Sequence, residues 1–240
     1  MPDKRTHRGP HPQDGRLFAP DQHVRLREAV ADLSWLLARK YAVTSALKLV
    51  GDRHSLTERQ RMAVWRSACG DESLAGRLGR MRSPGDLTHE TITVDGYNLL
   101  ITIESALGGG VILIGRDGCY RDLAGLHGTY RKVKETLPAI LLIGEYLAGL
   151  SIEQAEWYLD SPVSNSGRLR GVLLDVAGQH GWNWQVRLQH NPDRQLVESG
   201  KTAVSSDSWV LDHCASWANV PRTLIEARIP GAHLIDLRSG

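Results

Sequence analysis

The chain has 240 residues, of which 41% are hydrophobic and 23% are charged, and its net charge is +2. This is the composition of an ordinary globular protein, and its apolar stretches are too short to cross a membrane. The polar first residues lack the apolar core of a secretion signal, and three widely separated cysteines outside any CxxC pair argue against a disulfide framework or a zinc ribbon, so a reducing cytoplasm is expected.

The positive charge is concentrated in the first third of the chain. Residues 1–82 hold 16 Lys and Arg against nine Asp and Glu, whereas residues 83–240 hold 13 against 18. Residues 1–16 are polar and rich in Pro and His, which is typical of a flexible tail. Residues 17–82 are expected to form a basic helical module, whose cations either make a positive face for a polyanion or are ordinary solvated side chains.

Apolar residues spaced three and four apart predict three helices in this module. The first covers residues 21–37, the second covers residues 43–50, and the third begins at Thr57. Gly and Pro become frequent over residues 70–89, so this stretch is expected to be a loose connection. Residues 83–90 within it are the predicted linker between two domains.

Predicted strands alternate with predicted helices after this linker. Short β-branched or alternating runs predict strands, and longer apolar runs that end at Gly or polar residues predict helices. The expected strands cover residues 91–94, 111–114, 155–159, 182–188 and 203–206, and the expected helices cover 97–107, 130–147, 167–180 and 209–217. Such alternation implies a mostly parallel sheet sandwiched by helices, so residues 91–240 are expected to form one α/β domain.

Three of the expected strands end in an aspartate. Asp95 follows TITV, Asp160 follows AEWYL and Asp207 follows AVSS. The carboxyl ends of neighbouring parallel strands share one edge of a sheet, where ligands bind. Clustered carboxylates are the oxygen ligands that Mg²⁺ or Mn²⁺ prefers, and such cations assist phosphodiester hydrolysis. Asp212 is a candidate fourth acid, although each aspartate taken alone is also explained as a helix cap or a turn.

Two motifs around these acids resemble those of PIN-like and NYN-type metal-dependent nucleases. VDGYNLL is similar to their first strand with its Asp-Gly-x-Asn end, and VSSDSWVLD is similar to their late Ser/Thr-x-Asp motif. The resemblance implies a PIN/NYN-like, Rossmann-like fold over roughly residues 91–220. The resemblance also implies a metal site in which Asp95, Asp160 and Asp207 are the ligands and Asp212 is a fourth acid. In this site Asn98 would orient Asp95 or a water molecule. Typical members space the last two acids more closely than this chain does, which leaves the role of Asp212 open.

The chain from about residue 16 to about residue 222 also resembles a conserved prokaryotic family of unknown function. The similar segments are DRHSLTERQR, DGYNLL, GRDGCYRDLAG, DSPVSNSGRL and SSDSWVLD. This wider resemblance is specific and covers most of the chain, but it implies no established activity.

Two further polar stretches are candidates for substrate binding. DSPVSNSGR precedes a predicted helix, whose N-terminus suits a phosphate, and GRDGCYRD mixes cations with acids. The candidate residues are Ser164, Asn165, Ser166 and Arg168 in the first stretch and Arg116 and Arg121 in the second. A capped helix and a surface turn with Arg–Asp pairs explain these stretches equally well. Asp193, in NPDR, is expected to be a turn residue.

The sequence therefore predicts a divalent-cation-dependent nuclease that acts on RNA. A basic segment beside strand-end acids suits a polyanionic substrate, with Mg²⁺ or Mn²⁺ as cofactor and no membrane contact. Motifs of other enzymes, namely GxxxxGK[ST], GxGxxG after a strand, GxSxG and HExxH, are absent from the sequence. Two alternatives stay open: a protein of the same fold that binds RNA or a protein partner without cleaving it, and a phosphohydrolase of small molecules.

Overall fold

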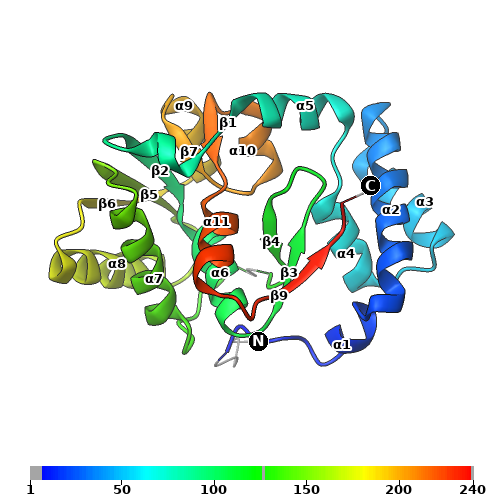
Figure 1. Cartoon of the computed structure of the whole chain (residues 1–240), viewed down its shortest axis with the longest axis horizontal. Coiled ribbons are helices and arrows are strands. Elements are labelled where there is room, and N and C mark those ends of the chain that lie inside the picture. Colours follow the sequence, from blue (N-terminus) through cyan, green and yellow to red (C-terminus); the bar gives the residue numbers. More distant parts are fainter. Residues whose placement is uncertain (1–6, 126–127, 239–240) are drawn as a thin grey trace.

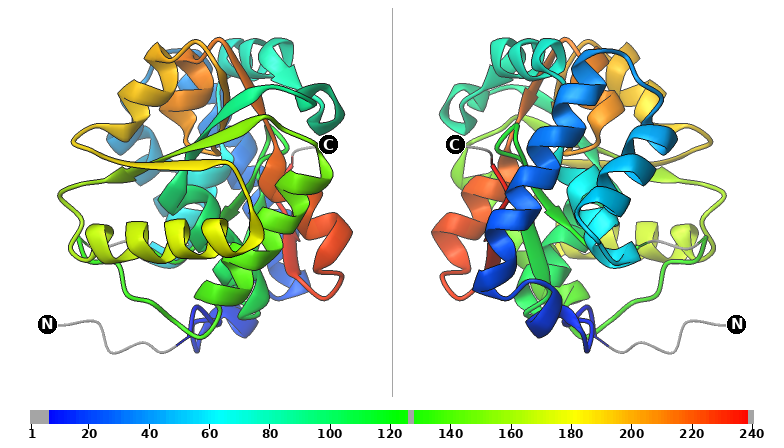
Figure 2. Two further views of the ribbon diagram at one scale, coloured as in Figure 1. Left: turned by 90° about the vertical axis from the view of Figure 1, so that its left-hand side faces the viewer. Right: turned by 90° about the vertical axis from the view of Figure 1, so that its right-hand side faces the viewer.

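The computed structural model describes residues 7–125 and 128–238, which form two β-sheets with helices around and between them (Figure 1). A three-stranded sheet lies beside a six-stranded sheet, and helix α6 (Gly96–Leu107) packs against strands of both. Helices near the N-terminus, coloured blue to cyan, form one face of the molecule (Figure 2, right). The structure confirms the predicted α/β class and the helical segment that precedes the sheet.

The six-stranded sheet is parallel throughout. Its strands in spatial order are β1 (Met81–Arg82), β8 (Ser216–Ala218), β7 (Thr202–Val204), β2 (Thr91–Asp95), β5 (Gln154–Asp160) and β6 (Trp184–Gln189). The helices that follow its strands are α6, α8 (Ser166–His180), α9 (Pro192–Glu198), α10 (Ser208–His213) and α11 (Val220–Arg228), and α7 (Thr136–Gly149) precedes β5. The central strands β2 and β5 are almost fully buried, as parallel strands covered on both faces should be.

Several elements of this α/β part differ from the expected ones. The helix expected over residues 130–147 begins only at Thr136, so Pro138 stands in its first turn, where its missing N–H leaves no hydrogen bond unmade. The helix expected over residues 209–217 ends at His213, and strand β8 follows it. Helices α9 and α11 were not predicted, and neither was the strand over His233–Asp236 that follows α11.

The N-terminal segment is helical, as expected, and contains two α-helices more than predicted, α1 and α5. Its elements are α1 (Asp14–Leu17), a 3-10 turn over Pro20–Gln22, α2 (His23–Ala38), α3 (Val43–Arg53), α4 (Glu58–Ser67) and α5 (Asp71–Arg80). Thr57 and Gln60 form a capping box at the start of α4. Helix α5 occupies half of the expected loose connection, and acids in its first turn and arginines in its last turn complement its dipole. Leu87, inside the expected linker, is fully buried.

The helical segment shares its core with the small sheet. This sheet has the order β4 (Tyr120–Asp122), β3 (Val111–Ile114) and β9 (His233–Asp236), with β3 antiparallel to β4 and parallel to β9. Leu113 of β3 and Ile235 of β9 belong to one buried cluster with Leu26 and Leu33 of α2. The segment expected to be a separate basic module is therefore packed onto strands β3 and β9 of the α/β part.

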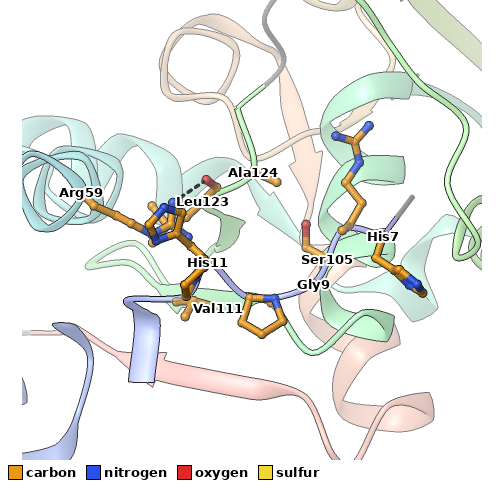
Figure 3. Close-up of a pocket in the computed structure, with 12 residues that line it drawn as sticks. His7, Gly9, His11, Arg59, Ser105, Val111, Leu123 and Ala124 are labelled. Atoms are coloured by element: carbon orange, nitrogen blue, oxygen red, sulfur yellow. Dashed lines mark hydrogen bonds between the residues drawn. The ribbon is translucent and has the colours of Figure 1, made fainter. Parts of the chain in front are cut away.

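Residues 7–16 are packed against the protein, contrary to the flexible tail expected there; residues 1–6 of that tail lie outside the described ranges. The Arg8 side chain is buried, and its Nε donates to Glu104 Oε2 at 2.8 Å. His11 and Arg59 help to line a cavity of about 320 Å³ beneath this segment, and Arg59 donates to the Leu123 carbonyl (Figure 3). A buried ion pair thus holds the start of the described chain in place.

Two expectations from composition concern cysteines and membranes. Cys69, Cys119 and Cys214 are buried and free of disulfides. Burial raises the pKa of the Cys69 thiol to about 11, which leaves it a poor nucleophile. None of the helices in the described ranges has both the length and the apolar character that crossing a bilayer requires.

Candidate functional site

The carboxyl ends of β7, β2 and β5 bring three of the predicted aspartates to one edge of the large sheet. Strand β2 lies between the other two, with Val94 opposite Val204 of β7 and Asp95 opposite Tyr158 of β5. Asp160 is the last residue of β5, and Asp207 stands three residues after β7, at the start of α10. The carboxylates are close enough for Asp207 to raise the pKa of Asp95.

Asp95 joins the end of β2 to the start of α6. Its Oδ1 accepts the backbone N–H of Asn98 at 3.3 Å, and its Oδ2 accepts the Ser205 hydroxyl at 2.9 Å. Burial, together with the negative charges of Asp193 and Asp207, outweighs these hydrogen bonds and raises the pKa of Asp95 to about 7. This carboxyl group therefore exchanges its proton near neutral pH.

Asn98 holds the loop that carries Asp207. Its Oδ1 accepts both the backbone N–H and the hydroxyl of Ser206 at 2.9 Å, while only its backbone N–H contacts the Asp95 carboxylate. Asp207 caps α10, because its Oδ1 accepts the N–H groups of Trp209 and Val210 at 2.8 and 3.2 Å. Asn98 thus positions Asp207 directly and the Asp95 side chain only through the backbone.

A pocket of about 280 Å³ opens at this edge of the sheet. Its walls include Asp95, Asp160, Asp193, Tyr97 and His190. The Oδ1 atom of Asp160 is buried and has no hydrogen-bond partner among the described residues. Burial raises the pKa of Asp160, and His190 opposes this shift. Asp160 thus contributes a carboxylate to the pocket wall, while one of its oxygens stays buried and unpaired among the described residues.

Asp193 is the acid that the sequence prediction missed. It stands in the first turn of α9, which Asn191 caps by accepting the Arg194 N–H at 3.0 Å. Burial and the charges of Asp207 and Asp160 raise the pKa of Asp193 to about 6. The signal for a helix start was present, since Asn precedes Pro at the first helical position. We call Asp95, Asp160, Asp193 and Asp207 the acidic site.

Asp212, the predicted fourth acid, belongs to a different contact. Arg77 of α5 donates from Nε and a terminal nitrogen to the two Asp212 oxygens at 2.7 and 2.9 Å. The same guanidinium donates to Asp117 at 2.6 Å. Asp212 therefore anchors α5 to α10, and the structure does not bring it into the acidic site.

The two arginines predicted to bind substrate are engaged by the protein. Arg121 is buried, donates twice to Asp117 at 2.8 and 2.7 Å, and donates from Nε to the Ser206 carbonyl at 2.8 Å. Burial alone would raise the pKa of Asp117, but Arg121 and Arg77 hold it well below its usual range. Arg116 donates to the Cys69 carbonyl and to Asp71. Arg121 thus supports the loop before Asp207.

The predicted phosphate-binding stretch forms part of a second pocket. This pocket of about 220 Å³ is lined by Asn165, Arg168, Tyr130, Arg131, Lys132, Thr136, Leu169 and Val172. Ser164 lies at its edge and holds the facing segment, because its carbonyl accepts the Tyr130 N–H at 3.1 Å. Ser166 starts α8 and is buried. Tyr130 and Tyr97 connect this pocket to the acidic one, with ring centroids 5.4 Å apart.

A third pocket, of about 190 Å³, shares Asp207 with the acidic site. Ser206 and Asn98 also line it, together with Trp65 and Arg66 of α4. The Trp65 side chain is half exposed. The sequence places Arg66 among the cations of the helical module, which are either a positive face or solvated side chains, and it does not single out Trp65 as a candidate for binding. An exposed indole beside a guanidinium is a surface on which nucleic-acid bases stack.

The oxygen donors of the acidic site suit a hard divalent cation, but the site is not a finished cage. Within residues 7–125 and 128–238, no three His, Cys, Asp or Glu side chains form a group that could hold a metal ion. Burial is the main cause of the raised pKa values of Asp95 and Asp193, and the negative charges of neighbouring aspartates in the acidic site add to both shifts. The donor chemistry of these carboxylates, and not their present arrangement, suits Mg²⁺ or Mn²⁺.

Comparison with known proteins places the chain among proteins without an assigned activity. A family described as a domain of unknown function (DUF5616) matches residues 84–223, and a second, described as a protein of unknown function (DUF434), matches residues 25–80. The uncharacterized protein MJ0935 of Methanocaldococcus jannaschii is 27% identical over 188 residues, which cover 78% of this chain and 89% of that protein. No solved structure is significantly similar to the chain.

Proposed function

The chain belongs to the DUF5616 family, and from its acidic site we propose that it is a divalent-cation-dependent nuclease that hydrolyses phosphodiesters of RNA. The observation that carries the proposal is the acidic site itself, where Asp95 has a pKa of about 7 and Asp193 has one of about 6. Buried, mutually repelling carboxylates are costly for stability, so their presence at a ligand-binding edge indicates a function.

We assign cation binding to the residues at the strand ends. Asp95, Asp160 and Asp207 would hold Mg²⁺ or Mn²⁺, because carboxylate oxygens are the ligands these ions prefer. When bound, such a cation activates water and stabilises the departing oxygen. The resemblance of VDGYNLL and VSSDSWVLD to motifs of PIN-like and NYN-type nucleases supports the same assignment.

The remaining groups prepare the site for a phosphodiester. Asp193, whose pKa lies near neutral pH, takes the proton of an attacking water molecule, since a general base works best when its pKa is close to the working pH. Ser205 fixes the Asp95 carboxylate and Asn98 fixes the Asp207 loop. Trp65 and Arg66 are assigned to a flanking base and phosphate.

The basic N-terminal segment contributes less free charge than its composition suggests. Arg59 pairs with Asp14, Arg61 with Asp52 and Arg77 with Asp117. Because these arginines are already paired with acids of the fold, they are not free to bind phosphates. We therefore assign the nucleic-acid contacts to cations around the acidic site. The proposal therefore depends on the geometry of the site and not on the net charge of residues 1–82.

Cleavage assays on the full chain test the proposal. End-labelled single-stranded and hairpin RNAs, incubated with Mn²⁺ and resolved on denaturing gels, should be cut by the wild type and left intact when EDTA is present. The Asp95→Asn variant should cleave at least about 100-fold more slowly, because it loses a cation-binding carboxylate. Asp175→Asn, on the exposed face of α8, is the matched control and should cleave like the wild type.

Two outcomes would contradict the nuclease proposal. Cleavage that persists in EDTA would show that no divalent cation takes part. An Asp95→Asn variant as active as the wild type would mean that the acidic site is not where cleavage occurs, or that a contaminating nuclease produces it.

A non-catalytic RNA-binding protein of the same fold is the second candidate. It is favoured by the absence, in the described ranges, of three acidic or other ligating side chains already grouped for a cation. It is also favoured by the capping roles of Asp95 and Asp207 at α6 and α10. Salt-sensitive RNA binding without cleavage in Mg²⁺ or Mn²⁺ would select this candidate.

A further inference from the structure

The pocket beside α8 has the chemistry of an anion site. Arg131, Lys132 and Arg168 are exposed at its rim, and none of its lining residues is acidic. No ion pair within the described residues engages Lys132 or Arg168. Glu104, which accepts hydrogen bonds from the lining residues Tyr130 and Thr136, is paired with Arg8. Lys132 and Arg168 therefore give the pocket a local excess of positive charge.

The walls of this pocket are fixed by the backbone. Tyr130 N–H donates to the Ser164 carbonyl at 3.1 Å, and Ser164 N–H donates to the Gly128 carbonyl at 3.0 Å, which joins the two wall segments. Asn165 Nδ2 donates to the Tyr130 carbonyl at 3.0 Å. Asn165 adopts a left-handed conformation, with φ of 72°, directly before α8. This conformation has an energetic cost for asparagine, so the contacts around Asn165 must hold it in place.

The pocket is separate from the acidic site but adjacent to it. Tyr97 lines the acidic pocket and Tyr130 lines the basic one, and their rings are in contact. The Asp160 charge, after burial, raises the pKa of the Tyr97 hydroxyl, which places this tyrosine beside the acids. The two pockets therefore lie on either side of this buried tyrosine pair.

We propose that this pocket is a second phosphate subsite, which binds a phosphate of the nucleic-acid strand that flanks the phosphodiester held at the acidic site. The proposal rests on the proposed function and deepens it, because it fixes the substrate class. A mononucleotide or a small phosphate ester fills one pocket, whereas a single strand places successive phosphates in both. The apolar floor formed by Leu169 and Val172 adds a surface for a base or ribose.

Binding of RNA, measured separately from cleavage, tests the subsite. Fluorescence anisotropy with a labelled ten-nucleotide oligouridylate in EDTA gives the Kd of the full chain at several salt concentrations. The Lys132→Ala/Arg168→Ala variant should bind about tenfold more weakly at low salt, and the slope of log K against log salt should fall by about one. Both side chains are exposed, so the variant should keep the melting temperature of the wild type.

A matched variant removes the same charges elsewhere. Lys48→Ala/Arg53→Ala changes one Lys and one Arg on the exposed surface of α3, and it should keep the Kd and the salt slope of the wild type. A Lys132→Ala/Arg168→Ala variant that binds like the wild type would overturn the subsite, and so would a wild type that binds no RNA. If the wild type binds RNA through these residues but never cleaves it, the subsite stands and the nuclease proposal fails.

Discussion

Asp95 has two tasks that oppose each other. As the cap of α6 it must accept the Asn98 N–H, which favours the charged carboxylate. As a buried member of the acidic site it faces Asp193 and Asp207, which favour the protonated form. The second influence is the stronger one, since the pKa of Asp95 rises from 3.8 to about 7. Its protonation state should therefore be visible in the stability of the protein.

We expect the free energy of unfolding to fall between about pH 4 and pH 7 through Asp95. Over this interval the folded protein keeps a proton that the unfolded chain releases, so folding becomes less favourable as the pH rises, by up to roughly 4 kcal/mol. Asp95→Asn should remove most of this dependence in EDTA. Urea unfolding from pH 4.5 to pH 8, with Asp175→Asn as the control, measures the difference.

Addition of Mn²⁺ extends the same measurement. At pH 8 the cation should raise the melting temperature of the wild type, because it offsets the repulsion among the carboxylates, and it should raise that of Asp95→Asn much less. Parallel pH curves for the wild type and Asp95→Asn would refute the assigned pKa shift.

At the residue scale, the sequence predicts the aspartates that directly follow an apolar run. It does not predict the roles of Asp193 and Asp212, which stand within helices and depend on how those helices pack. Asp95, Asp160 and Asp207 could be predicted because a β-branched or apolar run points to each of them. Asp193 comes four residues after β6, within helix α9, and no β-branched or apolar run leads directly to it; its place depends on how α9 packs beside β2 and β5. The role of Asp212 depends on its ion pair with Arg77 of α5. The glycines of α5 favour a loop over a helix, so the sequence does not predict this helix.

The element that positions Asp95 is the tight junction between β2 and α6. A Cβ atom added to Gly96 would lie 2.6 Å from Leu159 Cδ2 and 3.0 Å from the Tyr158 carbonyl oxygen. Leu159 is itself fully buried, and the carbonyl belongs to the backbone of β5. Only glycine lets α6 start this close to the neighbouring strand.

We expect Gly96→Ala to lower the free energy of unfolding by about 1–3 kcal/mol, because neither neighbour can move without strain. RNA cleavage should fall as well, since Asp95 directly precedes the displaced residue. Gly171→Ala is the control: its Cβ would meet nothing within 4 Å in the middle of α8, and it should stabilise the protein by up to about 1 kcal/mol. Equal stabilities for the two variants, measured in urea, would refute this packing argument.

Among the elements, those with a strong local period are predictable and those that depend on partners are not. The repeating apolar residues of α2 and the buried run of β5 carry their own signal. Strand β9 has only four residues and is stable because it pairs with β3, from which it is separated by more than a hundred residues of sequence. The six-stranded order also depends on these distant pairings, so a local pattern cannot specify it.

At the scale of the whole molecule, the helical segment and the α/β part form one cooperative body. They share the buried cluster around β3 and β9, and Arg77 of α5 meets Arg121 at the carboxylate of Asp117. Arg121 in turn holds the carbonyl of Ser206, next to the acidic site. The N-terminal helices therefore contribute to the position of Asp207.

A fragment of residues 83–240 should not fold by itself. It would expose Val111, Leu113, Ile235 and Leu237, which the N-terminal helices cover in the whole chain. We expect the full chain to unfold in a single transition and the fragment to bind the dye ANS and to melt without a sharp transition. Calorimetry and dye fluorescence measure these properties, and a fragment that melts cooperatively near the temperature of the full chain would contradict the shared core.

The position of β9 has a consequence for biosynthesis. Helix α4 ends at Ser67, whereas β9, which completes the sheet beneath it, begins at His233. At roughly 5–20 residues per second, a ribosome needs on the order of ten seconds or more to make the intervening chain. Throughout that time the apolar sides of the first helices lack their final cover. The N-terminal helices can complete their packing only after β9 has been made.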